Sequence, residues 1–131
     1  MTVGILISIL AIILSIISLT MSIINMKFNR QMKLMETKND ILEKLIDSRN
    51  NLYDTIEQLK TFGRTKDGKS YTEKTNEAID RLNAIHEMIK KFILLFKSVP
   101  AKKAHKYYEE ANHHLYDIKT QTEGIKKTYD F

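Results

Sequence analysis

The chain has 131 residues with one Pro, four Gly and no Cys, and its 21 basic and 16 acidic side chains give a net charge of +5. The absence of Cys excludes a disulfide framework, a thiolate metal site and a cysteine nucleophile. So few helix breakers indicate long helices, and we expect an all-α protein. Basic residues exceed acidic ones by one in each of the stretches 27–62, 71–99 and 100–131. This even distribution argues against a dedicated nucleic-acid-binding surface.

The first stretch, residues 2–26, contains no charged side chain. Twenty-five residues make a helix of about 37 Å, which is enough to cross a hydrocarbon core of about 30 Å with some tilt. No basic residue precedes this stretch, and it ends at Met26-Lys27 without the small-residue cleavage site of a secretory signal. The sequence therefore predicts a retained transmembrane helix over residues 1–26, followed by a second domain over residues 27–131.

The flanks of this stretch indicate its orientation. Lys27, Arg30, Lys33 and Lys38 follow it closely, whereas only the α-amino group precedes it. Because basic residues remain on the cytoplasmic side, we expect the N-terminus outside the cell membrane and the C-terminal domain in the cytoplasm. The domain would then face the anionic inner leaflet of the bilayer.

The small residues within the apolar stretch follow a strict four-three spacing, typical of a helix–helix contact. They form a seam at Gly4, Ser8, Ala11, Ser15, Ser18 and Ser22. In lipid, helices associate by close backbone approach and interhelical hydrogen bonds, which small and hydroxyl side chains permit. The seam predicts a homo-oligomer. Two alternatives remain open: hydroxyls that bond only to carbonyls of their own helix, and a serine-lined pore.

The remainder of the chain predicts a cytoplasmic up-down-up antiparallel bundle of three amphipathic helices, at about residues 28–62, 71–98 and 100–128. Gly63–Ser70 is the clearest break, and Ser70 with Glu73 fits a capping box that opens the second helix. Pro100 ends the second helix. Apolar residues recur at heptad-like spacing, interrupted in the first helix by Lys38 and Arg49. The predicted stripes are Met35, Leu42, Leu45, Leu52, Ile56 and Leu59; Ala78, Leu82, Ile85, Ile89, Phe92, Phe96 and Val99; and Ala104, Tyr108, Ala111, Leu115, Ile118, Thr122, Ile125 and Tyr129.

The end of the second helix is apolar on all sides and ringed by lysines. We call this the knuckle: Lys90, Lys91, Phe92, Leu94, Leu95, Phe96, Lys97, Lys102 and Lys103. One interpretation is a surface that touches the inner leaflet, with Leu94, Leu95 and Phe96 as its apolar part and the lysines on anionic headgroups. The alternative is a buried helix end, with Leu94 or Leu95 packed on the first helix or on a sister subunit.

The third helix carries His105, Glu109, His113 and Asp117 at four-residue intervals, and Glu110 with His113 forms an i, i+3 pair. Such spacing can place metal ligands on one face. The di-iron bundle pattern uses the same pair but needs a second copy and two more carboxylates, and the sequence has no second copy. The row also points away from the apolar stripe. We therefore expect a polar outer face without metal or cofactor.

Arg81 and His86 have the loose Arg–His spacing that resembles the motif of HEPN-type ribonucleases, which are also helical bundles. The family's polar residue after the Arg is replaced here by Leu82, a predicted core position. The sequence also lacks a Gly-rich phosphate loop and a nucleophile beside a base. We expect no enzyme.

These features favour a single-pass membrane protein that self-associates through its transmembrane helix and presents a cytoplasmic helical domain to a protein partner, as a scaffold, adaptor or regulator. The alternative is a small membrane-active effector, a pore-forming or depolarising protein of the phage lysis or cellular defence type, gated by its cytoplasmic bundle. Neither hypothesis invokes nucleic acid.

Overall fold

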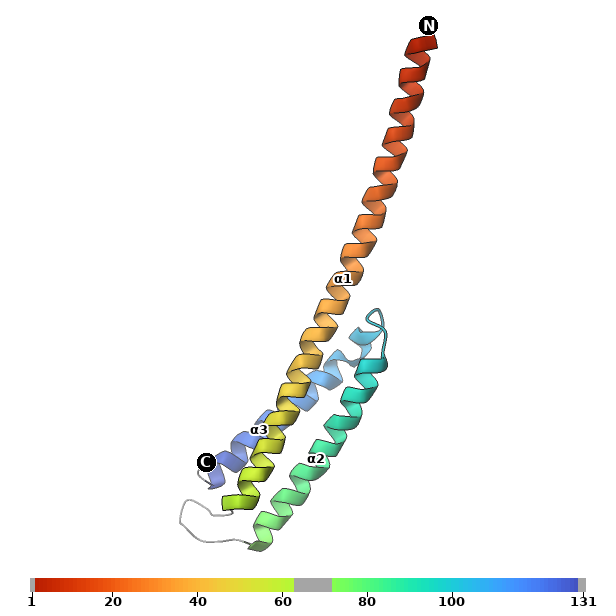
Figure 1. Cartoon of the computed structure of the whole chain (residues 1–131). Coiled ribbons are helices and arrows are strands. Elements are labelled where there is room, and N and C mark those ends of the chain that lie inside the picture. Colours follow the sequence, from red (N-terminus) through yellow and green to blue (C-terminus); the bar gives the residue numbers. More distant parts are fainter. Residues whose placement is uncertain (1, 63–71, 130–131) are drawn as a thin grey trace. The chain divides into compact units, whose positions relative to one another are not determined.

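A computed structural model describes residues 2–62 and 72–129, and this part of the chain is helical (Figure 1). The α-helices are α1 (Thr2–Phe62), α2 (Thr72–Ser98) and α3 (Tyr108–Tyr129), and a 3₁₀-helix, η1 (Ala104–Tyr107), precedes α3. The expectation of an all-α protein with one long apolar N-terminal helix is confirmed. The predicted Gly63–Ser70 loop and the capping residue Ser70 lie outside the described residues.

The length of α1 follows from its sequence. No Gly or Pro lies between Ile5 and Phe62, so every residue of that stretch donates its backbone N–H and can hold helical dihedrals at ordinary cost. Its first part is uniformly apolar and its last part is amphipathic. These two parts belong to different compact units, Met1–Glu36 and Thr37–Phe131.

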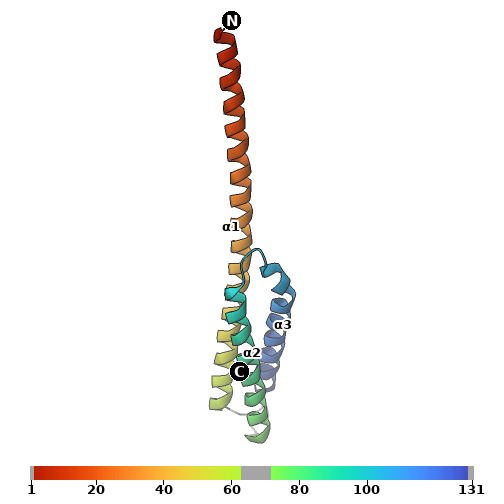
Figure 2. The same cartoon turned by 90° about the vertical axis from the view of Figure 1, so that its right-hand side faces the viewer.

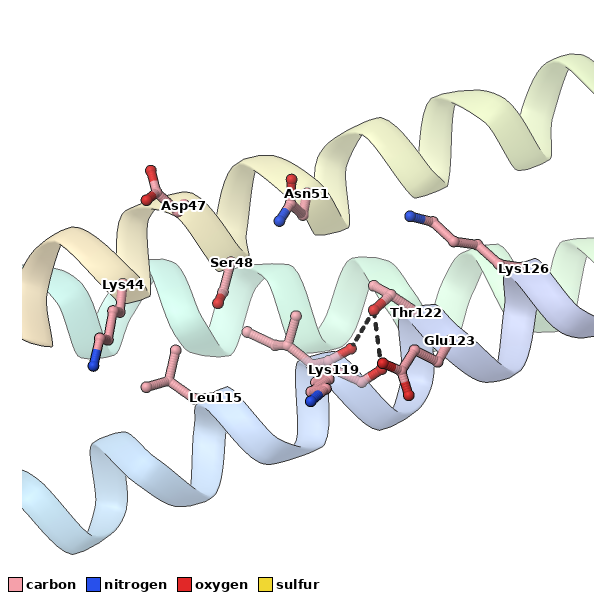
Figure 3. A pocket seen from close by; sticks show the side chains of 10 residues that line it. Lys44, Asp47, Ser48, Asn51, Leu115, Lys119, Thr122, Glu123 and Lys126 are labelled. Atoms are coloured by element: carbon pink, nitrogen blue, oxygen red, sulfur yellow. Dashed lines mark hydrogen bonds between the residues drawn. The ribbon is translucent and has the colours of Figure 1, made fainter. Parts of the chain in front are cut away.

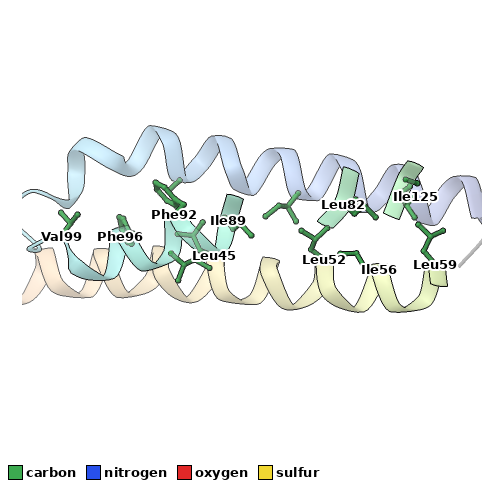
Figure 4. Packing of buried hydrophobic residues seen from close by; sticks show 14 of the residues in the cluster. Leu45, Leu52, Ile56, Leu59, Leu82, Ile89, Phe92, Phe96, Val99 and Ile125 are labelled. Carbon is green, nitrogen blue, oxygen red and sulfur yellow. The ribbon is translucent and has the colours of Figure 1, made fainter. Parts of the chain in front are cut away.

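Within the second unit, three helical segments lie side by side, namely α2, α3 and the last part of α1. Figures 1 and 2 show α2 antiparallel to this part of α1, and α3 antiparallel to α2. Each helix turns one apolar stripe inward, as heptad-like spacing dictates for amphipathic helices. The stripes meet in one hydrophobic core that runs along the unit (Figure 4).

The core consists largely of the predicted stripe residues. Its buried members are Leu45, Leu52, Ile56 and Leu59 from α1; Ala78, Leu82, Ile89, Phe92, Ile93, Phe96 and Val99 from α2 and its end; and Ala104, Ala111, Ile118, Ile125 and Tyr129 from η1 and α3. Leu42, Ile85, Tyr108 and Leu115 are partly buried at its edges. Met35 is an exception to the predicted pattern, because it is 50% exposed and belongs to the first unit.

The connection from α2 to α3 differs from the prediction, which started the third helix at residue 100. The α-helix begins only at Tyr108, after turn residues 101–103 and the short helix η1. Here the backbone N–H groups of Lys103 and Ala104 donate to the carbonyls of Pro100 and Ala101 at 2.9 and 3.4 Å, which are three-residue turn bonds. The chain must reverse direction while Val99 and Ala104 remain buried. Tight turns achieve this reversal in few residues, whereas an α-helix from residue 100 cannot.

Candidate functional site

The seam residues are all exposed in the described chain, as is every residue of α1 up to Lys33. At about 100° per residue, the six positions of the seam fall within an arc of about 80° on α1. A Cβ built on Gly4 would meet no atom within 4 Å apart from the adjacent residues and the backbone of its own helix. The seam is therefore one continuous strip of small side chains that no part of its own unit covers.

Two hydroxyls of the seam bond to their own helix. Ser8 Oγ donates to the Gly4 carbonyl at 3.0 Å, and Ser15 Oγ donates to the Ala11 carbonyl at 2.8 Å. This is the self-bonded arrangement that the sequence left open. It satisfies each hydroxyl proton, while the oxygen keeps a lone pair for a donor on a neighbouring helix. The same geometry recurs off the seam at Thr20, which donates to the Ile16 carbonyl at 2.8 Å.

The knuckle divides into two sets. Phe92 and Phe96 are 5% and 0% exposed and stack on each other with ring centroids 5.9 Å apart, so they belong to the core. Phe96 therefore does not contribute to an outer apolar surface. Leu94 and Leu95 are 62% and 45% exposed. At about 100° per residue, Leu94 lies opposite the two rings on α2 and Leu95 lies on the flank of the helix. Neither is covered by the first helix, and the five lysines of the knuckle are exposed around them.

Lys38 makes a contact that the sequence did not reveal. Its Nζ donates to the carbonyls of Lys97 and Val99 at 3.0 and 2.6 Å, and it lies 6.0 Å from the centre of the Phe96 ring. The last carbonyls of a helix have no partner within the helix and carry a partial negative charge. Lys38 thus caps the end of α2 from α1. Its apparent interruption of the apolar stripe is a polar contact between two helices.

A buried hydrogen bond lies at the opposite end of the core. The Thr75 and Tyr129 hydroxyl oxygens are 3.1 Å apart, and both residues are buried. This bond joins the first turns of α2 to the last turn of α3. Tyr108, by contrast, buries its hydroxyl without a hydrogen-bond partner among the described residues.

The polar row on the third helix makes pairs rather than a cluster. His113 Nε2 lies 3.3 Å from Asp117, and His114 Nε2 lies 3.7 Å from Glu110. His105, in η1, has its Nδ1 3.0 Å from the Lys102 carbonyl. Among the described residues, no three His, Asp or Glu side chains are grouped as metal ligands. Glu109 and His113 are exposed, so they line an outer face.

Arg81 and His86 have different surroundings on α2. Arg81 is exposed, whereas His86 is partly buried with its ring 6.2 Å from that of Tyr53. Tyr53 is itself half exposed. Neither residue lines the groove between α1 and α3 described below.

A groove of 480 Å³ runs between α1 and α3 (Figure 3). Lys44, Asp47, Ser48 and Asn51 line it from α1, and Leu115, Ile118, Lys119, Thr122, Glu123 and Lys126 line it from α3. Thr122 Oγ1 donates to the carbonyls of Ile118 and Lys119 at 2.8 and 3.1 Å, so its hydroxyl is occupied within α3. The groove is bordered by charges of both signs.

The helix containing residues 2–26 is long and apolar enough to cross a membrane, and none of its most apolar window is buried. No protein-family model, curated protein or solved structure matches the chain significantly.

Proposed function

We propose that the chain is a single-pass membrane protein that self-associates through its transmembrane helix and carries a cytoplasmic antiparallel three-helix bundle for interaction with a protein partner. The observation that carries this proposal is that every residue from Thr2 to Met26 is exposed. In water, an uncovered row of Ile and Leu side chains over this length is strongly unfavourable, whereas in lipid the same helix has every backbone group satisfied.

The orientation proposed is N-terminus outside and bundle inside. It rests on Lys27, Arg30 and Lys33, which begin immediately after the apolar stretch. A cysteine introduced at Thr2 should react with a membrane-impermeant thiol reagent in intact cells, since the chain has no other Cys. Labelling only after the cells are opened would reverse the orientation.

Self-association is assigned to the seam. Replacing Ser15 and Ser18 with Leu puts two bulky side chains where neighbouring backbones would approach, so crosslinking of the full chain in detergent should fall to the level of a monomer. Ile13→Leu together with Ile17→Leu is the matched control, because these positions lie off the seam and change only the branching of the side chain. Equal crosslinking in the two variants would remove the seam from the interface.

The second candidate is a pore-forming or depolarising effector. Hydroxyl side chains along one strip of a lipid-facing helix are its specific support, because they can line water as well as pack. Ser8 and Ser15 can keep their bonds to their own helix in either function, so these bonds do not separate the two. Expression with a membrane-potential dye separates the two functions: depolarisation that Ser15→Leu abolishes supports the pore, and an unchanged potential supports the interaction protein.

A further inference from the structure

The net positive charge of the chain comes from one segment. Residues 88–108 contain six lysines, one His and no Asp or Glu, whereas the rest of the chain carries 15 basic and 16 acidic residues. The whole net excess therefore lies in this segment, which we call the basic end. The charge count over the stretches 71–99 and 100–131 is divided at Pro100, which lies within this segment, so its lysines are counted in two separate stretches. The expectation of an evenly spread charge is thus wrong.

The fold gathers this segment at one end of the core. It comprises the last turns of α2, the turn at 101–103, and η1. Its lysines are Lys90, Lys91, Lys97, Lys102, Lys103 and Lys106, and all six are exposed. None of them forms an ion pair among the described residues. Lys38 adds a further ammonium group at the end of α2.

Exposed apolar side chains lie among these charges. Leu94 is three to four residues from Lys90, Lys91 and Lys97, which makes these three lysines its neighbours on the helix surface. Leu94 and Leu95 are 62% and 45% exposed, Leu94 on the side of α2 away from Phe92 and Phe96 and Leu95 on its flank. The surface thus offers two aliphatic side chains surrounded by unpaired ammonium groups.

We infer that the basic end binds an anionic phospholipid surface, with Leu94 and Leu95 entering the headgroup–acyl boundary and the lysines contacting lipid phosphates and carboxylates. Aliphatic side chains amid lysines are the pattern of interfacial membrane binding. A nucleic acid would match the lysines but give the two leucines no favourable environment, because base stacking uses aromatic or guanidinium planes.

The inference rests on the proposed membrane anchor, which supplies the bilayer. Lys38, which contacts the end of α2, is twelve residues from Met26 along the chain. Even a fully extended path of that length spans only about 40 Å, so the anchor keeps the basic end near the bilayer. Each lysine that comes within a Debye length of an anionic surface strengthens the association about fivefold.

The test uses the full chain in nanodiscs of phosphatidylcholine, with or without phosphatidylserine, and lipids that carry a quencher near the headgroup. The absence of native Cys allows single fluorescent probes at Ser98→Cys, on the exposed side of the basic end, and at Asn76→Cys, near the start of α2. We expect quenching at residue 98 that increases with phosphatidylserine and exceeds that at residue 76. Equal quenching at the two sites, or no dependence on phosphatidylserine, would overturn the inference.

Charge variants identify the groups responsible. The triple variant K91E, K97E and K102E should abolish the part of the quenching at residue 98 that depends on phosphatidylserine. The expected weakening of the association between the basic end and the bilayer is about a hundredfold or more. The triple variant K44E, K119E and K126E makes the same change in net charge at exposed lysines beside the α1–α3 groove, and it should retain the quenching. Replacing Leu94 and Leu95 with Asn should weaken docking without unfolding, because both are exposed. Equal effects of the two triple variants would show a general charge effect and refute the assignment.

Two further measurements separate the alternatives. A probe at Ile13→Cys should be quenched by acyl-chain quenchers in both lipid compositions. If it is not quenched, the proposed membrane anchor is wrong. If residue 13 is quenched and residue 98 is not, the anchor stands and only the inference about the basic end is overturned. Binding of a single-stranded oligonucleotide to nanodiscs of phosphatidylcholine, lost in K91E, K97E and K102E, would refute the lipid assignment in favour of nucleic acid.

Discussion

Lys38→Met tests whether a lysine on α1 holds the end of α2. Met keeps much of the length of the aliphatic stem and removes the ammonium group, so the carbonyls of Lys97 and Val99 lose donors at 3.0 and 2.6 Å. Hydrogen bonds that involve a charged group contribute about 1.5–3 kcal/mol when buried, and a cation at a helix C-terminus adds about 0.3–1 kcal/mol.

Lys38 is only partly buried, so water replaces some of what is lost. We therefore expect the free energy of unfolding to fall by about 1–2 kcal/mol. In the variant, water can form a hydrogen bond with the Lys97 carbonyl more readily than with the Val99 carbonyl. For a helical unit of this size, a loss of 1 kcal/mol lowers Tm by about 4–8 °C. Lys38→Arg retains the charge and should recover part of the loss.

Thermal unfolding of the full chain in detergent, followed by circular dichroism, measures the effect. Lys44→Met is the matched control, because Lys44 is an exposed lysine on the same helix that borders the groove between α1 and α3. If Lys38→Met and Lys44→Met have the same Tm, the cap does not stabilise the unit and the reasoning fails.

Three substitutions and one control, Tyr53→Ala, test the rest of the packing by the same measurement. Leu52→Ala removes a side chain that is 0% exposed and should cost about 2–5 kcal/mol, whereas Tyr53→Ala, at a half-exposed neighbour, should change Tm far less; similar losses would place the core elsewhere. Tyr129→Phe removes the hydroxyl that pairs with Thr75 and should cost about 0.5–1.5 kcal/mol. Tyr108→Phe should be neutral or stabilising, because its buried hydroxyl has no hydrogen-bond partner among the described residues, and a clear destabilisation would reveal a partner.

The helical stripes were largely predictable. Leu45, Leu52 and Leu59 recur every seven residues and are buried, because a helix that repeats every 3.6 residues brings such positions to one side. The same rule correctly assigned Ala111, Ile118 and Ile125 to the core side of α3. Met35 fits the spacing but is exposed, since periodicity indicates which side a residue lies on and not how far along the helix its partners extend.

The end of α2 shows where the pattern becomes ambiguous. Phe92 and Phe96 match the core stripe, but they also lie in an apolar run with Leu94 and Leu95. Periodicity places the two phenylalanines on the core side, but it does not say whether another surface of the protein covers the two leucines. The structure assigns the two aromatic residues to the core and leaves the two leucines exposed. A charge count in a sliding window, rather than between helix boundaries, would have found the basic end.

The sequence by itself determined the uncharged stretch over residues 2–26, the helical class and most of the inward-facing residues, because hydrophobicity and helical periodicity are properties of neighbours in the chain. Only the tertiary structure decided that Lys38 caps α2, that Thr75 meets Tyr129, and that the third α-helix begins at Tyr108. These features depend on which residues meet across helices and on how the chain reverses between them. Contacts between residues more than fifty positions apart leave no periodic signal in a single sequence.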